Sequence, residues 1–214
     1  MSLFHDRIDA GRPLADLLHA AGLGGDEVVV LGLPRGGVPV ASEVARVLGV
    51  PLDVIIVRKL GAPSEPELAM GALGEDGVRV VNEGIMGSAA LSGADIGAIV
   101  RREEAELVRR ARRYREGRPR LNLQGRLAII VDDGIATGST ARAACRVARA
   151  HGAARVVLAV PVAPKATVLA LQDECDDLFS VASPESFSAV GEWYDDFSPT
   201  SDAEVVELLR NAQA

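Results

Sequence analysis

Apolar residues follow two alternating patterns along this chain. Unbroken apolar runs predict strands that are buried on both faces, and they occupy residues 28–33, 52–57, 127–131, 155–160 and 177–181. Between these runs, apolar positions recur at helical spacing, which indicates amphipathic helices, at residues 1–21, 38–48, 95–116, 141–151, 164–171 and from 202 onward. Repeated strand–helix units predict an α/β fold, in which a parallel twisted sheet carries helices on both faces.

Two segments interrupt this alternation. Residues 61–82 contain apolar runs that are broken by Glu75-Asp76-Gly77, a sequence typical of a hairpin turn. Residues 184–214 concentrate aromatic side chains before a final helix. Because 214 residues suffice for one well-buried core, we predict a single domain spanning residues 1–214.

Composition narrows the class of protein. Aromatic residues make up 3% of a chain that is 48% hydrophobic, so the core must be mainly aliphatic. We find no signal peptide and no apolar run long enough to span a membrane, and we expect a cytoplasmic protein. Cys145 and Cys175 are interpreted as buried thiols rather than a disulfide, and the histidines do not cluster as zinc ligands would.

Charge is unevenly distributed along the chain. The formal net charge is −7, which argues against nucleic acid as a partner. Residues 101–120 are nevertheless rich in arginine. Glutamates in this segment lie at helical spacing from the arginines, so we interpret it as a solvated helix face that carries Glu–Arg pairs.

The segment 127–140, LAIIVDDGIATGST, joins a buried strand to groups that bind ligands. Asp132 and Asp133 follow the strand, and a small, hydroxylic, glycine-bearing loop then leads into a helix. The N–H groups and the dipole at the start of a helix suit a phosphate. Because consecutive strand residues point to opposite faces, one carboxylate should face the ligand and the other turn away, unless the backbone bends.

Carboxylates do not bind phosphate, so the two acids must serve another part of the same ligand. Sugar hydroxyls and a hydrated Mg²⁺ ion are the groups that carboxylates suit. A phosphate beside a diol is found in a ribose 5-phosphate. The motif therefore predicts a site for a phosphorylated ribose.

Two further segments carry cations where anions could bind. The run at 28–33 leads into Pro34-Arg35-Gly36-Gly37 and then into a helix, which repeats the strand–glycine loop–helix pattern. The run at 52–57 ends at Arg58-Lys59. We expect these two cations at the carboxyl end of a parallel strand, where open α/β sheets bind their ligands.

The acid pair and its loop resemble the motif of the type I phosphoribosyltransferases that binds 5-phosphoribosyl 1-diphosphate (PRPP). The segments LGLPRGG, VRKLGAP and GEWYDDF also resemble those of a bacterial group of stand-alone phosphoribosyltransferases, so the likeness covers most of the chain. It implies the type I fold with a small hood. It also implies the transfer of 5-phosphoribosyl from PRPP to a nitrogenous base, with release of pyrophosphate, as part of nucleotide metabolism.

The resemblance assigns roles residue by residue. It implies that Asp132 and Asp133 hold the ribose hydroxyls and, through water, Mg²⁺. It implies that the 5-phosphate is bound by Ala136, Thr137, Gly138, Ser139 and Thr140. Pyrophosphate would be bound by the loop Arg35, Gly36 and Gly37, where the family commonly has a non-proline cis peptide bond. The catalytic group would consist of the two acids together with Arg58 and Lys59.

The resemblance also implies two parts that cover the ligand. A mobile loop closes over PRPP in the family, and residues 61–67 or 84–93 are the segments we expect to form it. A hood at residues 184–214 would hold the acceptor base, and stacking on that base would involve Trp193, Tyr194 and Phe197. The alternative is that these rings only pin the C-terminal helix to the core.

One departure from the family pattern bears on the acceptor. Enzymes of this family that act on 6-oxopurines usually have an aspartate just before the Thr-Gly, where this chain has Ala136. This argues against hypoxanthine and guanine, and it leaves adenine, orotate, uracil or an unusual acceptor open. A homodimer is also open.

Two other functions stay open at this stage. The basic segment 101–120 is compatible with a non-catalytic regulator or binding protein that senses PRPP. The acid pair is compatible with a metal-dependent hydrolase that acts on a sugar phosphate.

Overall fold

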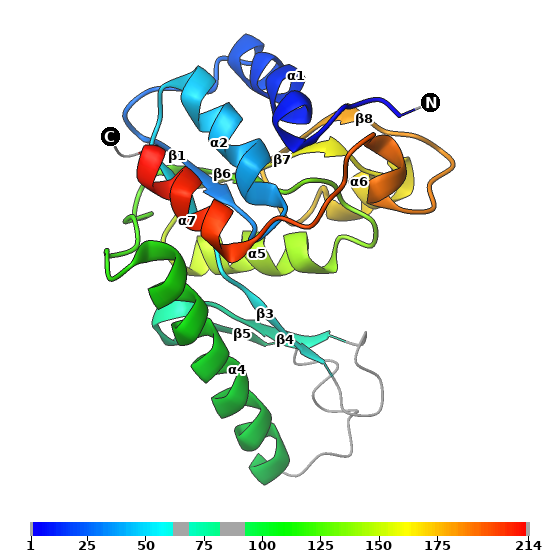
Figure 1. Cartoon of the computed structure of the whole chain (residues 1–214). Coiled ribbons are helices and arrows are strands. Elements are labelled where there is room, and N and C mark those ends of the chain that lie inside the picture. Colours follow the sequence, from blue (N-terminus) through cyan, green and yellow to red (C-terminus); the bar gives the residue numbers. More distant parts are fainter. Residues whose placement is uncertain (1, 62–68, 82–92, 213–214) are drawn as a thin grey trace.

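The computed structural model describes residues 2–61, 69–81 and 93–212. Within these residues, a five-stranded parallel sheet forms the centre of the molecule in the order β2-β1-β6-β7-β8 (Figure 1). Its strands are β1 (Val28–Gly32), β2 (Leu52–Val54), β6 (Leu127–Val131), β7 (Arg155–Val162) and β8 (Asp177–Ala182). The predicted parallel α/β sheet is confirmed, because each strand coincides with one of the apolar runs.

The strand register brings two strand ends together. Val30 of β1 lies opposite Ile129 of β6, and Gly32 lies opposite Val131. Strands β1 and β6 therefore finish side by side at the carboxyl edge of the sheet. The loops that follow these two strands therefore start next to each other, at the edge where open parallel sheets bind their ligands.

Alternate residues of each strand pack into two separate hydrophobic cores. Val30 and Ile129 pack on one face with the helices that cover it, which are α1 (Arg7–Ala20), α2 (Gly37–Leu48) and α7 (Asp202–Asn211). Leu31 and Ile130 point to the opposite face, which is covered by α5 (Ser139–Ala150) and α6 (Lys165–Leu171). The period of two along each strand thus explains why both faces need helices.

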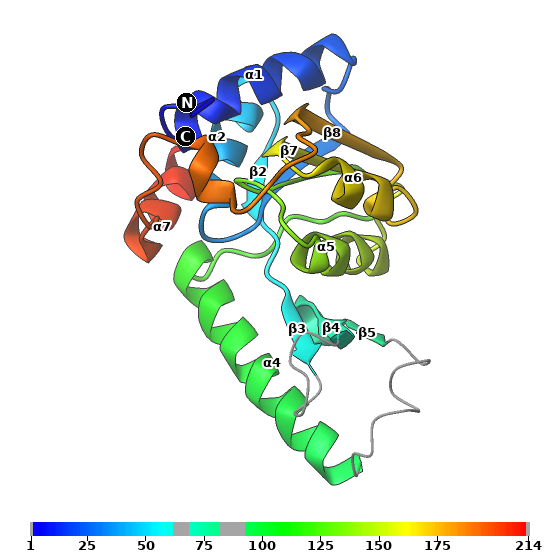
Figure 2. The same ribbon diagram turned by 90° about the vertical axis from the view of Figure 1, so that its right-hand side faces the viewer.

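A smaller antiparallel sheet and one long helix form an arm beside this core. The sheet has the order β3-β4-β5, with β3 (Arg58–Gly61), β4 (Ala69–Leu73) and β5 (Arg79–Val81). Helix α4 (Gly93–Arg115) runs along it, away from α1 and α2 (Figure 2). The short helix η1 (Glu75–Gly77) joins β4 to β5 and confirms the predicted hairpin.

The arm corrects one expectation about a strand end. Residues 52–57 were predicted as one strand with Arg58 at its carboxyl end, but β2 ends at Val54. Arg58 instead begins β3, where it pairs with Leu73. An apolar run indicates that a segment is buried, but it does not indicate which strand the segment pairs with. Here the chain leaves the parallel sheet after β2, and β3 pairs with β4 instead.

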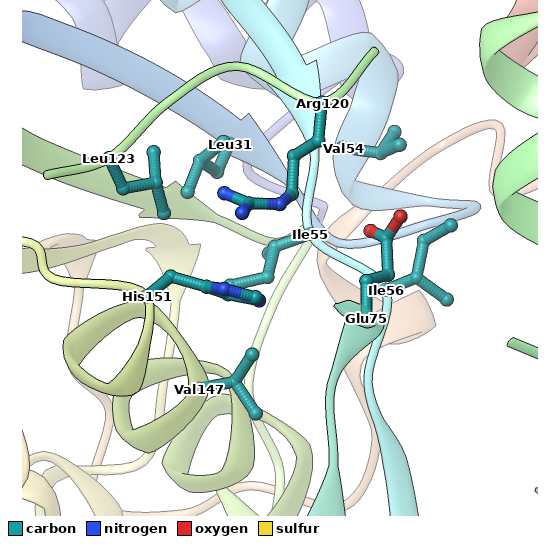
Figure 3. A pocket seen from close by; sticks show the side chains of 9 residues that line it. All are labelled: Leu31, Val54, Ile55, Ile56, Glu75, Arg120, Leu123, Val147 and His151. Carbon is teal, nitrogen blue, oxygen red and sulfur yellow. The ribbon is translucent and has the colours of Figure 1, made fainter. Parts of the chain in front are cut away.

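A buried arginine joins the arm to the core. Arg115 is 6% exposed, and its Nε donates to Asp53 of β2 at 2.7 Å, while its guanidinium also pairs with Glu75 of the arm. A small cavity beside Arg115 has a volume of only about 10 Å³. Figure 3 shows Arg120 and His151 among the side chains that line this cavity. That volume holds about one water molecule at most, so this cavity is too small to be a ligand site.

The C-terminal segment packs against the start of the chain. The main-chain N–H of Asp195 donates to the carbonyl of Phe4 at 2.9 Å, and Phe4 forms a parallel bridge with Tyr194. Helix α7 is anchored by Val205 and Leu209, which are buried in the core. The hood at 184–214 stays a prediction, and the arm is a second appendage that the apolar pattern did not reveal.

Three smaller expectations concern composition. Cys145 and Cys175 are free and buried, as predicted. None of the helices in the described part of the chain is long and apolar enough to cross a membrane. Within the same part, no three or more His, Cys, Asp or Glu side chains are grouped so that they could hold a metal ion.

Candidate functional site

Two glycine-rich loops meet where β1 and β6 end. Residues 34–37 follow β1 and lie directly against the acid pair that follows β6. A Cβ atom on Gly37 would lie 2.6 Å from the carbonyl oxygen of Val131, and one on Gly36 would lie 2.0 Å from Oδ2 of Asp133. Glycine is therefore required at both positions, because any side chain would separate the loop from the acids.

The first loop also contains the cis peptide bond that the resemblance implied. It is the bond between Pro34 and Arg35. The Arg35 side chain is 49% exposed, and its Nη1 lies 3.8 Å from Oδ1 of Asp202, at the start of α7. This loop thus places a partly exposed cation beside the two strand ends, in a long ion pair with Asp202.

The second loop borders a cavity of about 210 Å³. The cavity is lined by Asp132, residues 134–141 and Val190. Gly138 has a φ of 76°, and a Cβ atom there would lie 2.9 Å from Cδ1 of Leu171. The cavity includes the start of α5, where N–H groups and the helix dipole favour an anion.

The two acids point in different directions. Asp132 lines the cavity, while the Asp133 carboxylate accepts a hydrogen bond from Nε of Arg7 at 2.9 Å and lies 2.9 Å from Nη2 of the same side chain. Both members of the Arg7–Asp133 pair are largely buried, at 11% and 15% exposure. Asp132 therefore borders the cavity, whereas the Asp133 carboxylate lies between Arg7 and the loop at residues 34–37.

Arg7 is a residue that sequence reasoning missed. Its Nη1 donates to the carbonyl of Ser198 at 2.8 Å, and its guanidinium lies 4.0 Å from the ring centre of Phe197. The Tyr194 hydroxyl donates to the main-chain carbonyl of Asp133. Arg7 lies 126 positions before Asp133, and one arginine in an amphipathic helix gives no signal of such a contact.

Comparison with known proteins identifies the family. The family model of the phosphoribosyl transferase domain matches residues 4–196. The chain belongs to the phosphoribosyltransferase family. The chain is 57% identical over 212 residues to two Mycobacterium tuberculosis proteins, from strains CDC 1551 / Oshkosh and H37Rv. Their names are "Putative phosphoribosyl transferase MT0597" and "Putative phosphoribosyl transferase Rv0571c".

The relatives differ from this chain in length. The match covers 99% of this chain but 47% of each mycobacterial protein, so the chain spans about half the length of these relatives. The crystal structure of TT1426 from Thermus thermophilus matches 99% of both chains, with 44% identity and a TM-score of 0.88. The fold described above, including the arm, therefore matches a solved structure along nearly its whole length.

Burial governs the electrostatics of the acid pair. Burial raises the pKa of Asp132 well above its ordinary value, and the neighbouring charge of Asp133 raises it further. Burial also raises the pKa of Asp133, although the Arg7 guanidinium opposes this increase. Two carboxylates held this close favour a nearby cation. Mg²⁺ fits this chemistry, because it is commonly held by one or two carboxylates together with substrate phosphates.

The two cations expected beside pyrophosphate lie on the arm. Nε of Arg58 donates to a carboxylate oxygen of Glu103 on α4 at 2.6 Å. For Lys59 only the backbone belongs to the described part of the chain, where it pairs with Ala72. The segments expected to form the mobile loop, residues 61–67 and 84–93, lie outside the described residues apart from the backbone of Gly61 and Gly93.

Aromatic residues of the C-terminal segment form a packed cluster with Phe4. Tyr194 is 5% exposed, and its ring centre lies 5.4 Å from that of Phe4 and 5.0 Å from that of Phe197. Trp193 stacks with Phe187 at 6.3 Å. These contacts join Tyr194 and Phe197 to each other and to Phe4 near the start of the chain, so both base stacking and the pinning of the C-terminal helix stay predictions.

Proposed function

We propose that this protein transfers the 5-phosphoribosyl group from PRPP to a nitrogenous base and releases pyrophosphate. One observation carries the proposal: the 210 Å³ cavity combines a helix start with a carboxylate, and a second glycine-rich loop lies against the same acid pair. A ligand that fits all three parts has a phosphate, a diol and a second anionic group. PRPP has these groups in this order.

The proposed roles follow the directions of the side chains. The 5-phosphate binds to the loop Ala136 to Thr140, which lines the cavity. Asp132 binds the ribose hydroxyls and, through water, Mg²⁺. Asp133 supports this arrangement through its contact with Arg7 rather than by facing the cavity. Bound Mg²⁺ would neutralise charge on the pyrophosphate as that group leaves.

Pyrophosphate is proposed to bind at the loop that contains Arg35, Gly36 and Gly37. The Arg35 guanidinium is partly exposed, and its ion pair with Asp202 is long at 3.8 Å, so it can turn to an incoming anion. Negative charge that develops on the leaving group would be stabilised there. Arg58 can take part only if it leaves Glu103, and Lys59 is proposed for the same anion.

The arginine-rich helix gives little support to a regulator that binds nucleic acid. Arg109 and Arg110 both pair with Glu106 at 2.7 Å, and Arg113 pairs with Asp202 at 2.8 Å. Arginines that are already paired within the protein have less charge to offer to a phosphate backbone. These pairs support the interpretation of this segment as a solvated helix face.

Thermal unfolding with and without PRPP and Mg²⁺ tests the binding step. A ligand at a hundred times its dissociation constant should stabilise the protein by about 2.7 kcal/mol. A panel of bases, including adenine, orotate, uracil, hypoxanthine and guanine, is then assayed for pyrophosphate release. No stabilisation at millimolar PRPP would refute the proposal, and binding without turnover of any base would favour a PRPP-sensing protein.

A further inference from the structure

Helix α6 contacts the loop that borders the cavity. The hydroxyl of Thr167 donates a hydrogen bond to the main-chain carbonyl of Ala136 at 2.7 Å. A Cβ atom built on Gly138 would lie 3.1 Å from the methyl group of Thr167 and 2.9 Å from Leu171. Thr167 therefore bonds to one loop residue through its hydroxyl and packs against another through its methyl group.

The hydrogen bond sets the direction of one peptide group. Among the described residues, the cis bond lies between Pro34 and Arg35, so the bond between Ala136 and Thr137 is trans. In a trans peptide the C=O and N–H groups point in opposite directions. Ala136 and Thr137 line the cavity, whereas Thr167 is not part of its lining. A carbonyl turned toward Thr167 thus turns the N–H of Thr137 away from Thr167, in a peptide whose two residues both line the cavity.

Helix α6 is itself held firmly. Leu171 is completely buried in the core, and the N–H of Lys165 donates to the carbonyl of Pro184 at 3.1 Å. Arg142, in the first turn of α5, donates to the carbonyl of Ala170 at 3.2 Å. A β-branched side chain such as threonine also has few rotamers on a helix. The hydroxyl of Thr167 therefore has a well-defined position relative to the loop.

We propose that Thr167 is a positioning residue for the 5-phosphate, because it orients the Ala136–Thr137 peptide so that the N–H of Thr137 can bind this group. The inference rests on the proposed function and adds a residue outside the loop that binds the phosphate. Thr167 touches no ligand in this proposal. It acts through the backbone, so its loss should weaken the binding of phosphate at this loop and leave the other anion site unaffected.

The test compares three variants of the whole chain. Thr167→Val keeps the shape but removes the donor, Thr167→Ser keeps the donor, and Leu169→Ala changes the same helix at a side chain that is 59% exposed. Isothermal titration measures binding of ribose 5-phosphate, PRPP with Mg²⁺, and pyrophosphate with Mg²⁺. Thr167→Val should bind ribose 5-phosphate roughly fivefold to tenfold more weakly, which is the loss expected for one hydrogen bond.

The remaining results separate positioning from a general structural role. Thr167→Val should bind pyrophosphate and unfold thermally like the wild type, and Thr167→Ser and Leu169→Ala should bind all three ligands normally. In amide NMR spectra, ribose 5-phosphate should shift the Thr137 signal in the wild type, and this shift should be reduced in Thr167→Val.

Two outcomes would overturn the inference while the proposed function stands. In the first, wild type and Thr167→Val bind ribose 5-phosphate equally well. In the second, Thr167→Val loses as much affinity for pyrophosphate as for ribose 5-phosphate, and it also loses thermal stability. A third outcome is distinct from both. If the wild-type protein bound neither PRPP nor ribose 5-phosphate, the proposed function would fail and this inference would fail with it.

Discussion

Replacing Arg7 by methionine should leave the Asp133 carboxylate buried without its cation. Both side chains are well under one-fifth exposed, at 11% and 15%. Removal of one partner from a buried ion pair typically costs about 3–5 kcal/mol. We expect the lower end, about 3 kcal/mol of unfolding free energy near pH 7, because methionine can still pack against Phe197 and some solvent reaches the site.

The pH dependence of this loss has a definite sign. Burial raises the folded-state pKa of Asp133, and Arg7 opposes that increase in the wild type. In Arg7→Met the folded-state pKa is therefore higher still, above the unfolded value of about 4. An acid with a raised folded-state pKa favours the folded state at low pH, and this stability is lost as pH rises through the folded-state pKa. The deficit of the variant should thus shrink as the pH is lowered from about 7 to about 5.

A double-mutant cycle isolates the ion pair. Asp133→Asn alone should cost about 1 kcal/mol, since the amide oxygen can still accept from Arg7. Arg7→Met with Asp133→Asn should be more stable than Arg7→Met alone by about 2 kcal/mol at pH 7, because no charge is left unpaired. Urea unfolding followed by circular dichroism, with EDTA present, measures all four proteins. A deficit below about 1 kcal/mol, or no rescue by Asp133→Asn, would refute this reasoning.

Three further predictions address the cavity and the arm. Asp132→Asn should abolish stabilisation by PRPP and Mg²⁺ in thermal unfolding while the free protein stays folded. Stabilisation equal to that of the wild type would mean that Asp132 is not part of the ligand site. Gly138→Ala should lower the unfolding free energy by about 1–2 kcal/mol in urea, because its Cβ would lie 2.9 Å from Leu171 at a φ of 76°. Arg115→Met should cost about 3–5 kcal/mol in urea, because Asp53 loses its buried partner; a cost below about 1 kcal/mol would contradict this.

Matched variants control these three measurements. Asp132→Asn is compared with Asp133→Asn, whose side chain faces Arg7 rather than the cavity. Gly138→Ala is compared with Gly22→Ala, which shares a positive φ of 74° but has no atom within 4 Å of the added Cβ. If both glycine variants lose the same stability, backbone strain alone explains the effect and contact with Leu171 contributes nothing. Arg115→Met is compared with Arg79→Met, which removes a more exposed partner from Glu104 on the same arm and should cost much less.

Patterns within short stretches of the sequence determine much of the fold. The apolar runs located all five strands of the parallel sheet, and the helical spacing located the helices of both faces. The sequence Glu75-Asp76-Gly77 likewise predicted the hairpin turn between β4 and β5. These features depend on residues close together in the chain, because side-chain alternation and helical periodicity are properties of a few consecutive residues.

The family and the composition of its ligand motif were also readable from the sequence. The segment 127–140 holds the acids, the glycines and the hydroxyls in one continuous stretch, so their order is visible without a structure. The alternation of strand residues even indicated that the two acids would diverge. It could not indicate which acid would face the cavity, because that depends on the face to which the ligand loop turns.

Contacts between distant segments were decided only by the tertiary structure. Arg7 reaches Asp133 across 126 positions, and Arg115 reaches Asp53 across 62. Arg58 belongs to the arm because β3 pairs with β4, although the apolar run before it resembles the other parallel strands. Such contacts follow from how completed helices and sheets pack, and one chain carries no periodic signal of its packing partners.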